Sequence, residues 1–359
     1  NASYLHFRLN FYSVPFAASL MFTTLGLWLW LKATPERHPG RGEHVHVGSW
    51  SVAGAQPLSL RHLAAGAACI AANFGCRPTF ALSALLCFPI FWPQITSLLQ
   101  GLKSRSLPPR KALRAPAAVI IPALIVVLPL MAYNVARFGS PLDFGNDYQM
   151  TVTDMTRFVQ PTANFLPSVG AYLFLPLRFT SEFPFIGMMP IAFREWGYYE
   201  PMAGGLFTAC PLLLLALAAP FLRRRMHRSG YWGLATCSLA LAVLLTVFDS
   251  HTAGLGWRYI CDFGWMMAIA ALVPMLYLMH PGGDAIVAGA PDPSERNEPR
   301  RDVTKRHPMM LACVRGLVVA ALMASIILAV LACFIPGRDD SLINNNPVLY
   351  DTVVAWFRL

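Results

Sequence analysis

The stretch AAVIIPALIVVLPLMAYNVARFGSPLDFGND, residues 117–147, decides the class of fold. Its first part, 117–133, carries no charged side chain, and a helix needs about twenty apolar residues to cross the hydrocarbon core of a membrane. The run then meets Arg137, and glycines, a proline and Asp143 follow. Glycine tolerates positive φ, and Pro141 disfavours helix in the residue before it. The stretch therefore predicts a membrane-spanning helix that stops at a turn just outside the bilayer.

The composition of the whole chain agrees with this prediction. Of the 359 residues, 56% are hydrophobic and 13% are charged, which is more apolar surface than a soluble globular protein can bury. The formal net charge is +10, and the basic residues stand in short clusters between apolar runs. That placement is typical of membrane topology and not of a nucleic-acid footprint. We expect an integral membrane protein with the lipid bilayer as partner and no nucleic-acid ligand.

Apolar runs recur along the chain and predict an all-α, polytopic transmembrane bundle of about eight helices. The expected crossings lie at 11–31, 60–76, 79–99, 116–134, 203–222, 231–248, 263–280 and 309–335. All four connections that must share one side are rich in Lys and Arg: 32–60, 100–115, 223–230 and 281–308. The positive-inside rule makes that side cytoplasmic, so 135–202, 249–262 and the C-terminal tail are expected outside.

The crossings divide the chain into three expected parts. Residues 1–280 hold the bundle and its long extracytoplasmic loop, 135–202. Residues 281–308 predict a flexible cytoplasmic linker, because they are rich in Gly, Pro and charge and have no apolar period. Residues 309–359 hold the final crossing and an extracytoplasmic tail. Within the long loop, residues 165–185 are apolar and aromatic but interrupted by prolines, so we expect interfacial helices there. They would border a lipid groove in a lipid-substrate enzyme, or form an aromatic belt in any other membrane protein.

Three segments resemble a known family. They are YNVARFGSPLDFGNDYQ at 133–149, GAACIAANFGCRPTFALSALL at 66–86 and GLGWRYICDFGWMMAIAALVPML at 254–276. They look like segments of bacterial membrane proteins related to the GT-C glycosyltransferases, in particular polyprenyl-phosphate-dependent enzymes of the family 39 and ArnT-like type. The resemblance covers about residues 10–280. It implies a multi-pass protein of the bacterial plasma membrane that transfers a sugar from a polyprenyl-phosphate donor at the extracytoplasmic face.

The chain departs from this family at its beginning. GT-C enzymes carry their catalytic acidic residue in the first extracytoplasmic loop, directly after the first helix, and no such loop precedes Phe11. We therefore expect either the C-terminal part of such a transferase, without its N-terminal catalytic part, or a protein that lacks this chemistry. Two alternatives stay open: a transporter or flippase-like protein whose arginines guide an anionic substrate, and a catalytically silent membrane scaffold.

The resemblance implies a site for the lipid phosphate at the outer surface. Sugar transfer leaves an anion on the lipid phosphate, and arginines at helix ends can stabilise it. Arg77, Arg137 and Arg258 fall on the predicted outer side. Each also has a simpler interpretation, because arginine at a membrane boundary commonly anchors to headgroups. Arg77 interrupts an apolar run, where a charge is costly.

Acceptor activation needs a carboxylate. The outer acidic residues are Asp143, Asp147, Asp154, Glu182, Glu195, Glu200, Asp249 and Asp262. None forms a recognisable catalytic pair, so no catalytic residue is assigned. Asp143 can cap a turn, and Asp262 follows Arg258 at helical spacing and can be its salt-bridge partner. The predicted lipid-phosphate or substrate site comprises Arg77, Arg137, Asp143, Arg258, Tyr259 and Asp262.

The sequence identifies no cofactor. EHVHVG at 43–48 places two histidines beside an acid, which is a weak metal-binding pattern. It stands on the predicted cytoplasmic side without further ligands, so no metal ligand is assigned, although a divalent ion is compatible with the proposed chemistry. Gly204 and Gly205 lack the strand and helix context of a nucleotide-binding turn.

Overall fold

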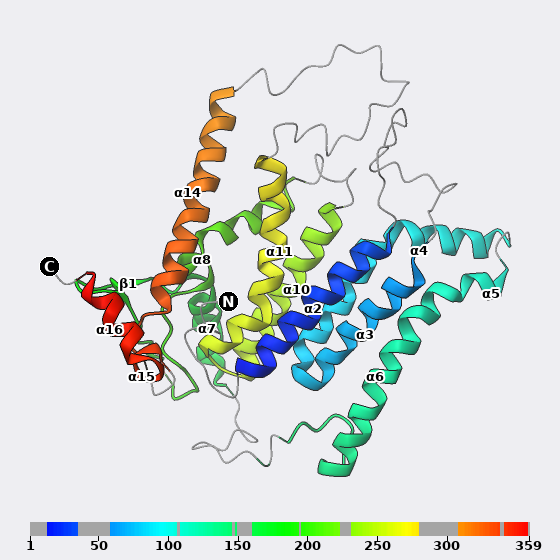
Figure 1. The fold of residues 1–359 in the computed structure, drawn as a ribbon, viewed down its shortest axis with the longest axis horizontal. Helices are drawn as coiled ribbons and strands as arrows, with labels where there is room; N and C mark the ends of the chain where they lie inside the picture. The colour runs from blue at the N-terminus through cyan, green and yellow to red at the C-terminus, as the bar shows by residue number, and fades with distance from the viewer. Residues whose placement is uncertain are drawn as a thin grey trace. The chain divides into compact units, whose positions relative to one another are not determined.

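The computed structural model describes residues 13–34, 58–105, 108–145, 148, 160–193, 195–222, 231–279, 308–337 and 341–357. They are mostly helical and divide into two compact units (Figure 1). The amino-terminal unit comprises 14–43 and 50–159, and the carboxy-terminal unit is mainly 160–359. The EHVHVG stretch and nearly all of the predicted linker lie outside the described residues.

The amino-terminal unit is a set of helices. Its elements are α2 (Ser13–Ala33), α3 (Leu60–Cys76), the 3₁₀ helix η2 (Pro78–Leu86), α4 (Cys87–Lys103), α5 (Pro109–Ala112) and α6 (Arg114–Phe138). The predicted break after residue 76 is confirmed. Arg77 is extended, with φ −148° and ψ 104°, because the proline that follows disfavours helix at this position.

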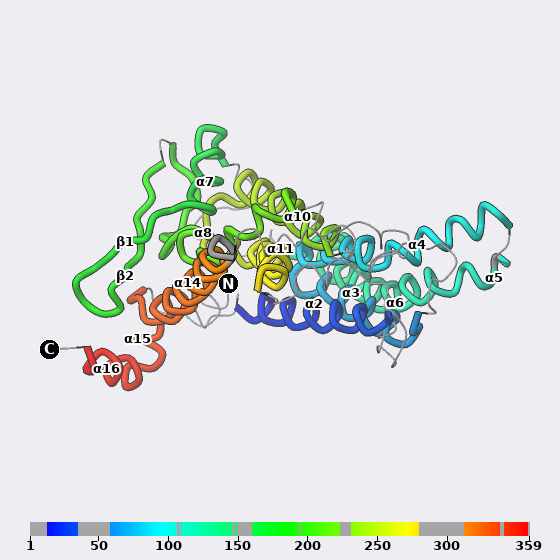
Figure 2. The backbone as a smooth tube through the Cα atoms, turned by 90° about the horizontal axis from the view of Figure 1, so that it is seen from above, coloured from blue at the N-terminus to red at the C-terminus, as the bar shows by residue number. Residues whose placement is uncertain are grey.

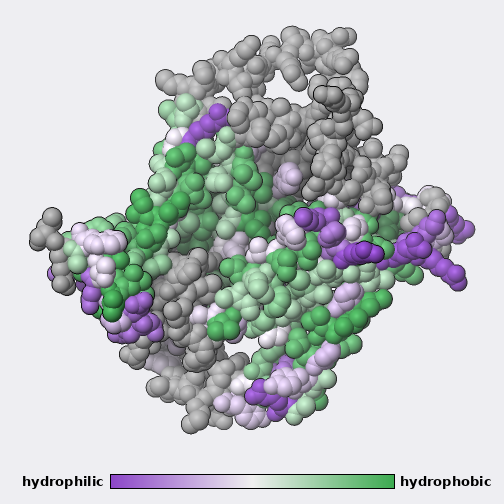
Figure 3. Space-filling model, viewed as in Figure 1, coloured by the Kyte–Doolittle hydropathy of each residue, from purple (hydrophilic) through white to green (hydrophobic). Residues whose placement is uncertain are grey.

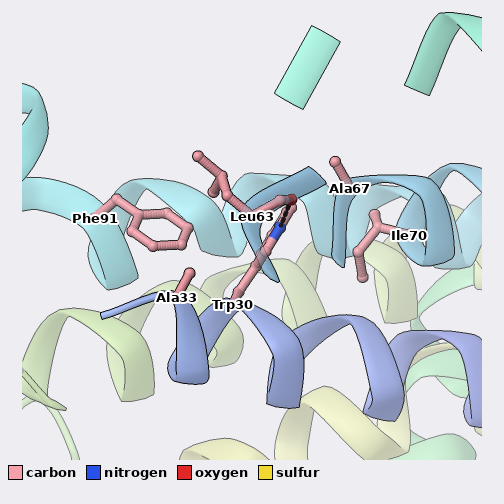
Figure 4. Close-up of a cluster of buried hydrophobic side chains, with 6 residues drawn as sticks. All are labelled: Trp30, Ala33, Leu63, Ala67, Ile70 and Phe91. Atoms are coloured by element: carbon pink, nitrogen blue, oxygen red, sulfur yellow. Dashed lines mark hydrogen bonds between the residues drawn. The ribbon is translucent and has the colours of Figure 1, made fainter. Parts of the chain in front are cut away.

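Small residues let α2 and α3 approach closely. A buried cluster joins them to α4 through Trp30, Ala33, Leu63, Ala67, Ile70 and Phe91 (Figure 4). The Trp30 indole Nε1 donates a hydrogen bond to the Leu63 carbonyl oxygen at 3.2 Å. A Cβ on Gly66 would overlap the Trp30 ring and would lie 2.9 Å from the Gly26 carbonyl oxygen. Contacts of this kind are typical of helices packed within a membrane.

The turn after α6 has the predicted form. The helix runs through two prolines and ends at Phe138, and Gly139 follows with φ +80°. The Gly139 amide donates to the Val135 carbonyl oxygen at 2.9 Å, which satisfies a carbonyl of the last helical turn. The predicted helix stop is therefore confirmed, four residues beyond the expected boundary at 134.

The carboxy-terminal unit contains further helices and a small hairpin. Its elements are α7 (Thr162–Phe174), β1 (Arg178–Phe179), β2 (Ile186–Gly187), α8 (Leu206–Ala209), η4 (Pro211–Ala218), α10 (Tyr231–Thr252), η6 (Trp257–Tyr259), α11 (Ile260–Met279), α14 (Pro308–Ala332), α15 (Leu342–Asn345) and α16 (Pro347–Ala355). α11 packs against α10 and η4, and α14 also packs against η4. β1 and β2 are antiparallel, with Arg178 opposite Gly187. The hairpin is a β element that the all-α prediction did not include.

Within the described residues, six helical segments are long and apolar enough to cross a membrane. They are Ser13–Ala33, Pro78–Lys103, Arg114–Phe138, Tyr231–Thr252, Trp257–Met279 and Ala312–Ala332. The surfaces of α6 and α14 are predominantly hydrophobic (Figure 3), as expected of helices that face lipid tails. The chain is thus a multi-pass membrane protein.

One predicted crossing takes a different form, and the count of eight stays a prediction. Residues 60–76 form α3, a 17-residue helix with the expected bounds. The run 203–222, expected as one helix, forms α8 and η4 with a break at Cys210, whose φ is −139°. Pro211 accounts for the break, because it disfavours helix in the preceding residue. In the long loop, α7 is a regular helix despite Pro167, and its interfacial location stays a prediction.

Candidate functional site

The three predicted site residues of the amino-terminal unit each make local contacts. The half-buried Arg77 guanidinium lies over the Phe16 ring, 4.1 Å from its centroid. The exposed Arg137 donates to the Tyr133 hydroxyl at 3.0 Å. Asp143 Oδ1 accepts from the Gly145 amide at 2.8 Å, which is the turn-capping geometry that the sequence also allowed.

The other three predicted residues, Arg258, Tyr259 and Asp262, come together at the start of α11. Two loops of the carboxy-terminal unit meet there, 195–202 before α8 and 253–259 between α10 and α11. The Glu200 amide donates to the Leu255 carbonyl oxygen at 2.8 Å, and the Leu255 amide donates to the Tyr198 carbonyl oxygen at 3.0 Å. The backbone thus fixes Glu200 beside the loop that carries Arg258.

The Tyr172 hydroxyl holds the second loop in place. Tyr172 projects from α7 and is fully buried. Its hydroxyl donates to the Gly254 carbonyl oxygen at 2.9 Å and accepts from the Gly256 amide at 3.0 Å. Burial raises the pKa of Tyr172 well above its usual value, so the hydroxyl keeps its proton at physiological pH. Gly254 has φ +82°, a conformation that favours glycine.

Arg258 is the centre of a small polar cluster. Its Nη1 lies 3.9 Å from Glu200 Oε1, and its Nη2 donates to the hydroxyls of Tyr198 and Tyr259, each at 3.2 Å. The Tyr198 hydroxyl in turn donates to Glu200 Oε1 at 2.7 Å. Burial raises the pKa of Tyr198, and the Glu200 charge raises it further. The Arg258 side chain stays 17% exposed.

Three buried carboxylates belong to this region. Glu200 is 7% exposed, Asp249 is 3% exposed at the end of α10, and Asp262 is fully buried in the first turn of α11. Asp249 and Asp262 lie within segments apolar enough to span a membrane. Buried ionisable residues in such segments are costly and commonly mark functional sites. The start of α11 also favours an acid, because a helix N-terminus carries partial positive charge.

A polar stripe runs along the buried face of α7 toward the same loops. It consists of Gln160, Asn164, Ser168 and Tyr172, which recur at every fourth residue and are all almost fully buried. Among the described residues, both amide atoms of Gln160, Asn164 Oδ1, Ser168 Oγ and Glu200 Oε2 have no hydrogen-bond partner. Native proteins leave few buried polar groups in this state. The stripe therefore provides buried donors and acceptors for a polar ligand.

Several of these residues carried no signal in the sequence. Glu200 and Asp249 stood among eight outer acids without diagnostic spacing, and the sequence did not single out Glu200 as an ion-pair partner of Arg258. The stripe on α7 could have been found from its four-residue spacing inside an apolar segment. Within the described part of the chain, no group of three His, Cys, Asp or Glu side chains could hold a metal ion.

Tyr172→Phe is expected to destabilise the loop between α10 and α11. The change leaves the Gly254 carbonyl and the Gly256 amide without their hydroxyl partner, which costs about 1–3 kcal/mol for each buried group left unpaired. Thermal unfolding of the detergent-purified protein should show a lower transition temperature, and amide hydrogen exchange should become faster in residues 253–257.

Tyr133→Phe is the matched control. Its hydroxyl contacts the exposed Arg137, so we expect no change in unfolding temperature. Equal stability of the two variants would mean that the Tyr172 hydroxyl does not hold the loop.

The arrangement of side chains around Arg258 is therefore the feature of the structure that best indicates a function. It joins a guanidinium, two tyrosine hydroxyls and buried carboxylates at the end of an apolar helix. No protein-family model, no curated protein and no solved structure matches this chain.

Proposed function

We propose that this chain is a membrane glycosyltransferase of the GT-C type, or the C-terminal part of one, and that Arg258 binds the phosphate of a polyprenyl-phosphate-linked sugar. The sequence resemblance supplies the substrate class. The single observation that carries the proposal is the mostly buried Arg258 guanidinium at the start of an apolar helix, held by Glu200 and two tyrosines. The positive-inside rule puts this helix end on the extracytoplasmic side.

The geometry suits a phosphate ligand for physical reasons. Arginine presents five donors in a planar fork, and its bonds to phosphate are charge-assisted. The Nη1 to Glu200 Oε1 distance of 3.9 Å is longer than the 2.7–2.9 Å of a close charge-assisted bond. Glu200 therefore contributes charge beside the guanidinium without a close hydrogen bond from Nη1. A phosphate oxygen beside the guanidinium could accept charge-assisted hydrogen bonds from it.

The sugar has suitable partners in the same unit. Sugar hydroxyls both donate and accept hydrogen bonds, and amides and carboxylates match both roles. Glu200 Oε2 and the amide groups of Gln160 and Asn164 supply such atoms, with no hydrogen-bond partner at Glu200 Oε2, Asn164 Oδ1 or either Gln160 amide atom among the described residues. The tyrosine rings around Arg258 add apolar faces against which a sugar ring can pack.

Binding of the phosphate lipid tests the proposal directly. The purified chain in nanodiscs is titrated with polyprenyl phosphate and, separately, with uncharged polyprenol of the same length. We expect the phosphate lipid to bind at least about tenfold more tightly, since one charge-assisted contact contributes about 1.5–3 kcal/mol. Equal affinity for the two lipids would contradict the proposal. A transfer assay with labelled lipid-linked sugar then distinguishes an enzyme from a binding protein.

Arg77→Ala tests another predicted phosphate ligand and is expected to weaken polyprenyl-phosphate binding about tenfold. Arg77 is half-buried against Phe16, whereas Arg137 is exposed, so Arg137→Ala should have the smaller effect. The same nanodisc titration measures both variants. Unchanged affinity in Arg77→Ala and also in Arg258→Ala would overturn the phosphate-binding roles of these arginines.

A transport function is the second candidate, and one observation favours it. Asp249 and Asp262 are buried inside apolar segments, as is common for residues that line the path of a transported ion or polar substrate. Accumulation of the lipid-linked sugar in sealed vesicles, without any covalent product, would favour transport over transfer.

A further inference from the structure

Four phenylalanine rings from separate parts of the carboxy-terminal unit form one cluster. Phe183 and Phe185 lie between β1 and β2, Phe334 follows α14, and Phe357 follows α16. The Phe183 ring stacks on Phe357 with centroids 4.5 Å apart and meets Phe334 edge-on at 5.3 Å. Phe185 completes the phenylalanine cluster at 5.9 Å from Phe357. The hairpin and α16 are thereby tied to the end of α14 (Figures 1 and 2).

The end of α14 sets the depth of this cluster in the membrane. The segment Ala312–Ala332 is long and apolar enough to cross the bilayer, and Phe334 follows it at once. Phe334 therefore lies at the boundary between lipid tails and headgroups. Rings that contact Phe334 lie near the same level, where aromatic side chains are enriched in membrane proteins.

One face of α16 carries large apolar side chains that no described residue covers. At 3.6 residues per turn, Val348, Leu349 and Trp356 share this face, and they are 75%, 45% and 74% exposed. The opposite face holds the buried Tyr350. The exposed Asp351 stands on the edge of the helix away from Leu349 and Trp356. α16 thus turns large apolar side chains outward, with the exposed Thr352 among them.

We propose that α16 lies in the membrane interface, with Val348, Leu349 and Trp356 in contact with lipid and the phenylalanine cluster as its anchor. The bilayer is the occupant of this face because α14 crosses it immediately before the cluster. A short helix at this level can bury exposed apolar side chains among the headgroups and upper acyl chains. This inference does not depend on the proposed enzymatic function.

The anchor has a structural consequence for the loop that bears Glu200. Beyond β2, the Met189 amide donates to the Met202 carbonyl oxygen at 2.8 Å, and the Glu200 amide donates to the Leu255 carbonyl oxygen at 2.8 Å. Backbone bonds therefore connect the hairpin to the loops around Arg258. An interfacial α16 fixes the depth at which these loops stand.

Quenching of Trp356 by brominated lipid tests the anchor in the full chain. The protein is reconstituted in vesicles whose lipids carry bromine either high on the acyl chain, near the headgroup, or close to the chain end. The chain has nine tryptophans, so the Trp356 signal is the difference between the wild type and Trp356→Phe. We expect this signal to lose most of its intensity with the shallow bromine and much less with the deep one.

Trp92 provides the positive control, because it is 47% exposed within the apolar segment Pro78–Lys103. The difference between the wild type and Trp92→Phe should fall in brominated vesicles. A Trp356 signal that is equal in brominated and plain vesicles, while the Trp92 signal falls, would overturn the proposal and leave a protein partner or a second copy as the occupant. Trp356 is exposed, so its replacement should not prevent folding.

Discussion

Arg258→Ala is expected to weaken polyprenyl-phosphate binding by about tenfold to hundredfold and to remove the preference for the phosphate lipid over polyprenol. The guanidinium is the cation that the structure holds among Glu200, Tyr198 and Tyr259, and its bonds to a phosphate would be charge-assisted. Titration of the two lipids into nanodiscs measures the loss. Arg178→Ala, an exposed change in the same unit, should leave both affinities unchanged.

The single variant also affects folding, and a second variant separates the two effects. Removing Arg258 leaves the Glu200 carboxylate without its cation, which costs up to about 3–5 kcal/mol for a buried pair. The double variant Arg258→Ala with Glu200→Gln removes both charges. We expect it to recover much of the thermal stability but none of the phosphate affinity. Wild-type affinity in the double variant would show that Arg258 is not the phosphate ligand.

Arg258→Lys refines this test because it keeps the charge and loses the planar fork. Lysine cannot form the paired bonds that arginine makes with phosphate. An intermediate affinity would therefore indicate a directed contact, whereas full recovery would indicate general attraction between charges.

Much of the fold follows from the sequence because the signals that end these helices are local. Pro78 ends α3 where the CRPT interruption predicted a break, and Gly139 ends α6 with the positive φ that the turn needs. The run 203–222 shows the limit of this reasoning. Its apolar composition is that of a crossing, but Pro211 and the extended Cys210 divide it. Composition predicts whether a segment lies in the membrane or in water, but it does not predict whether its backbone stays helical.

The site could be predicted only in part, because its contacts are long-range. Arg258 drew attention as a charge at the boundary of an apolar run, and such a boundary can be found from local composition. Its partner Glu200 lies far away in the chain, and the Tyr172 hydroxyl bonds a carbonyl 82 residues away. Neither pairing leaves a periodic pattern. Only the fold of the carboxy-terminal unit brings these residues together.

Gly205→Ala is expected to destabilise the folded chain by about 3 kcal/mol or more. A Cβ at this position would lie 2.5 Å from the Leu175 amide nitrogen and 2.6 Å from the Phe174 amide nitrogen. These are backbone atoms at the end of α7, so no side-chain rotation can relieve the overlap. No nucleotide-binding context surrounds this glycine in the sequence, and the structure assigns it a packing role, because α8 begins where its backbone contacts the backbone at the end of α7.

Gly170→Ala is the matched control, since Gly170 lies in α7 and a Cβ there meets no atom within 4 Å. Alanine favours the helix by about 0.5–1 kcal/mol over glycine, so this variant should be as stable as the wild type or slightly more stable. Thermal unfolding in detergent compares the three proteins. The Gly205 amide also donates to the Leu175 carbonyl oxygen at 2.9 Å, five residues after Glu200. Any Gly205→Ala protein that folds should therefore bind polyprenyl phosphate more weakly, because the shift passes along the backbone to Glu200. Wild-type stability of Gly205→Ala would mean that α7 and α8 separate at little cost.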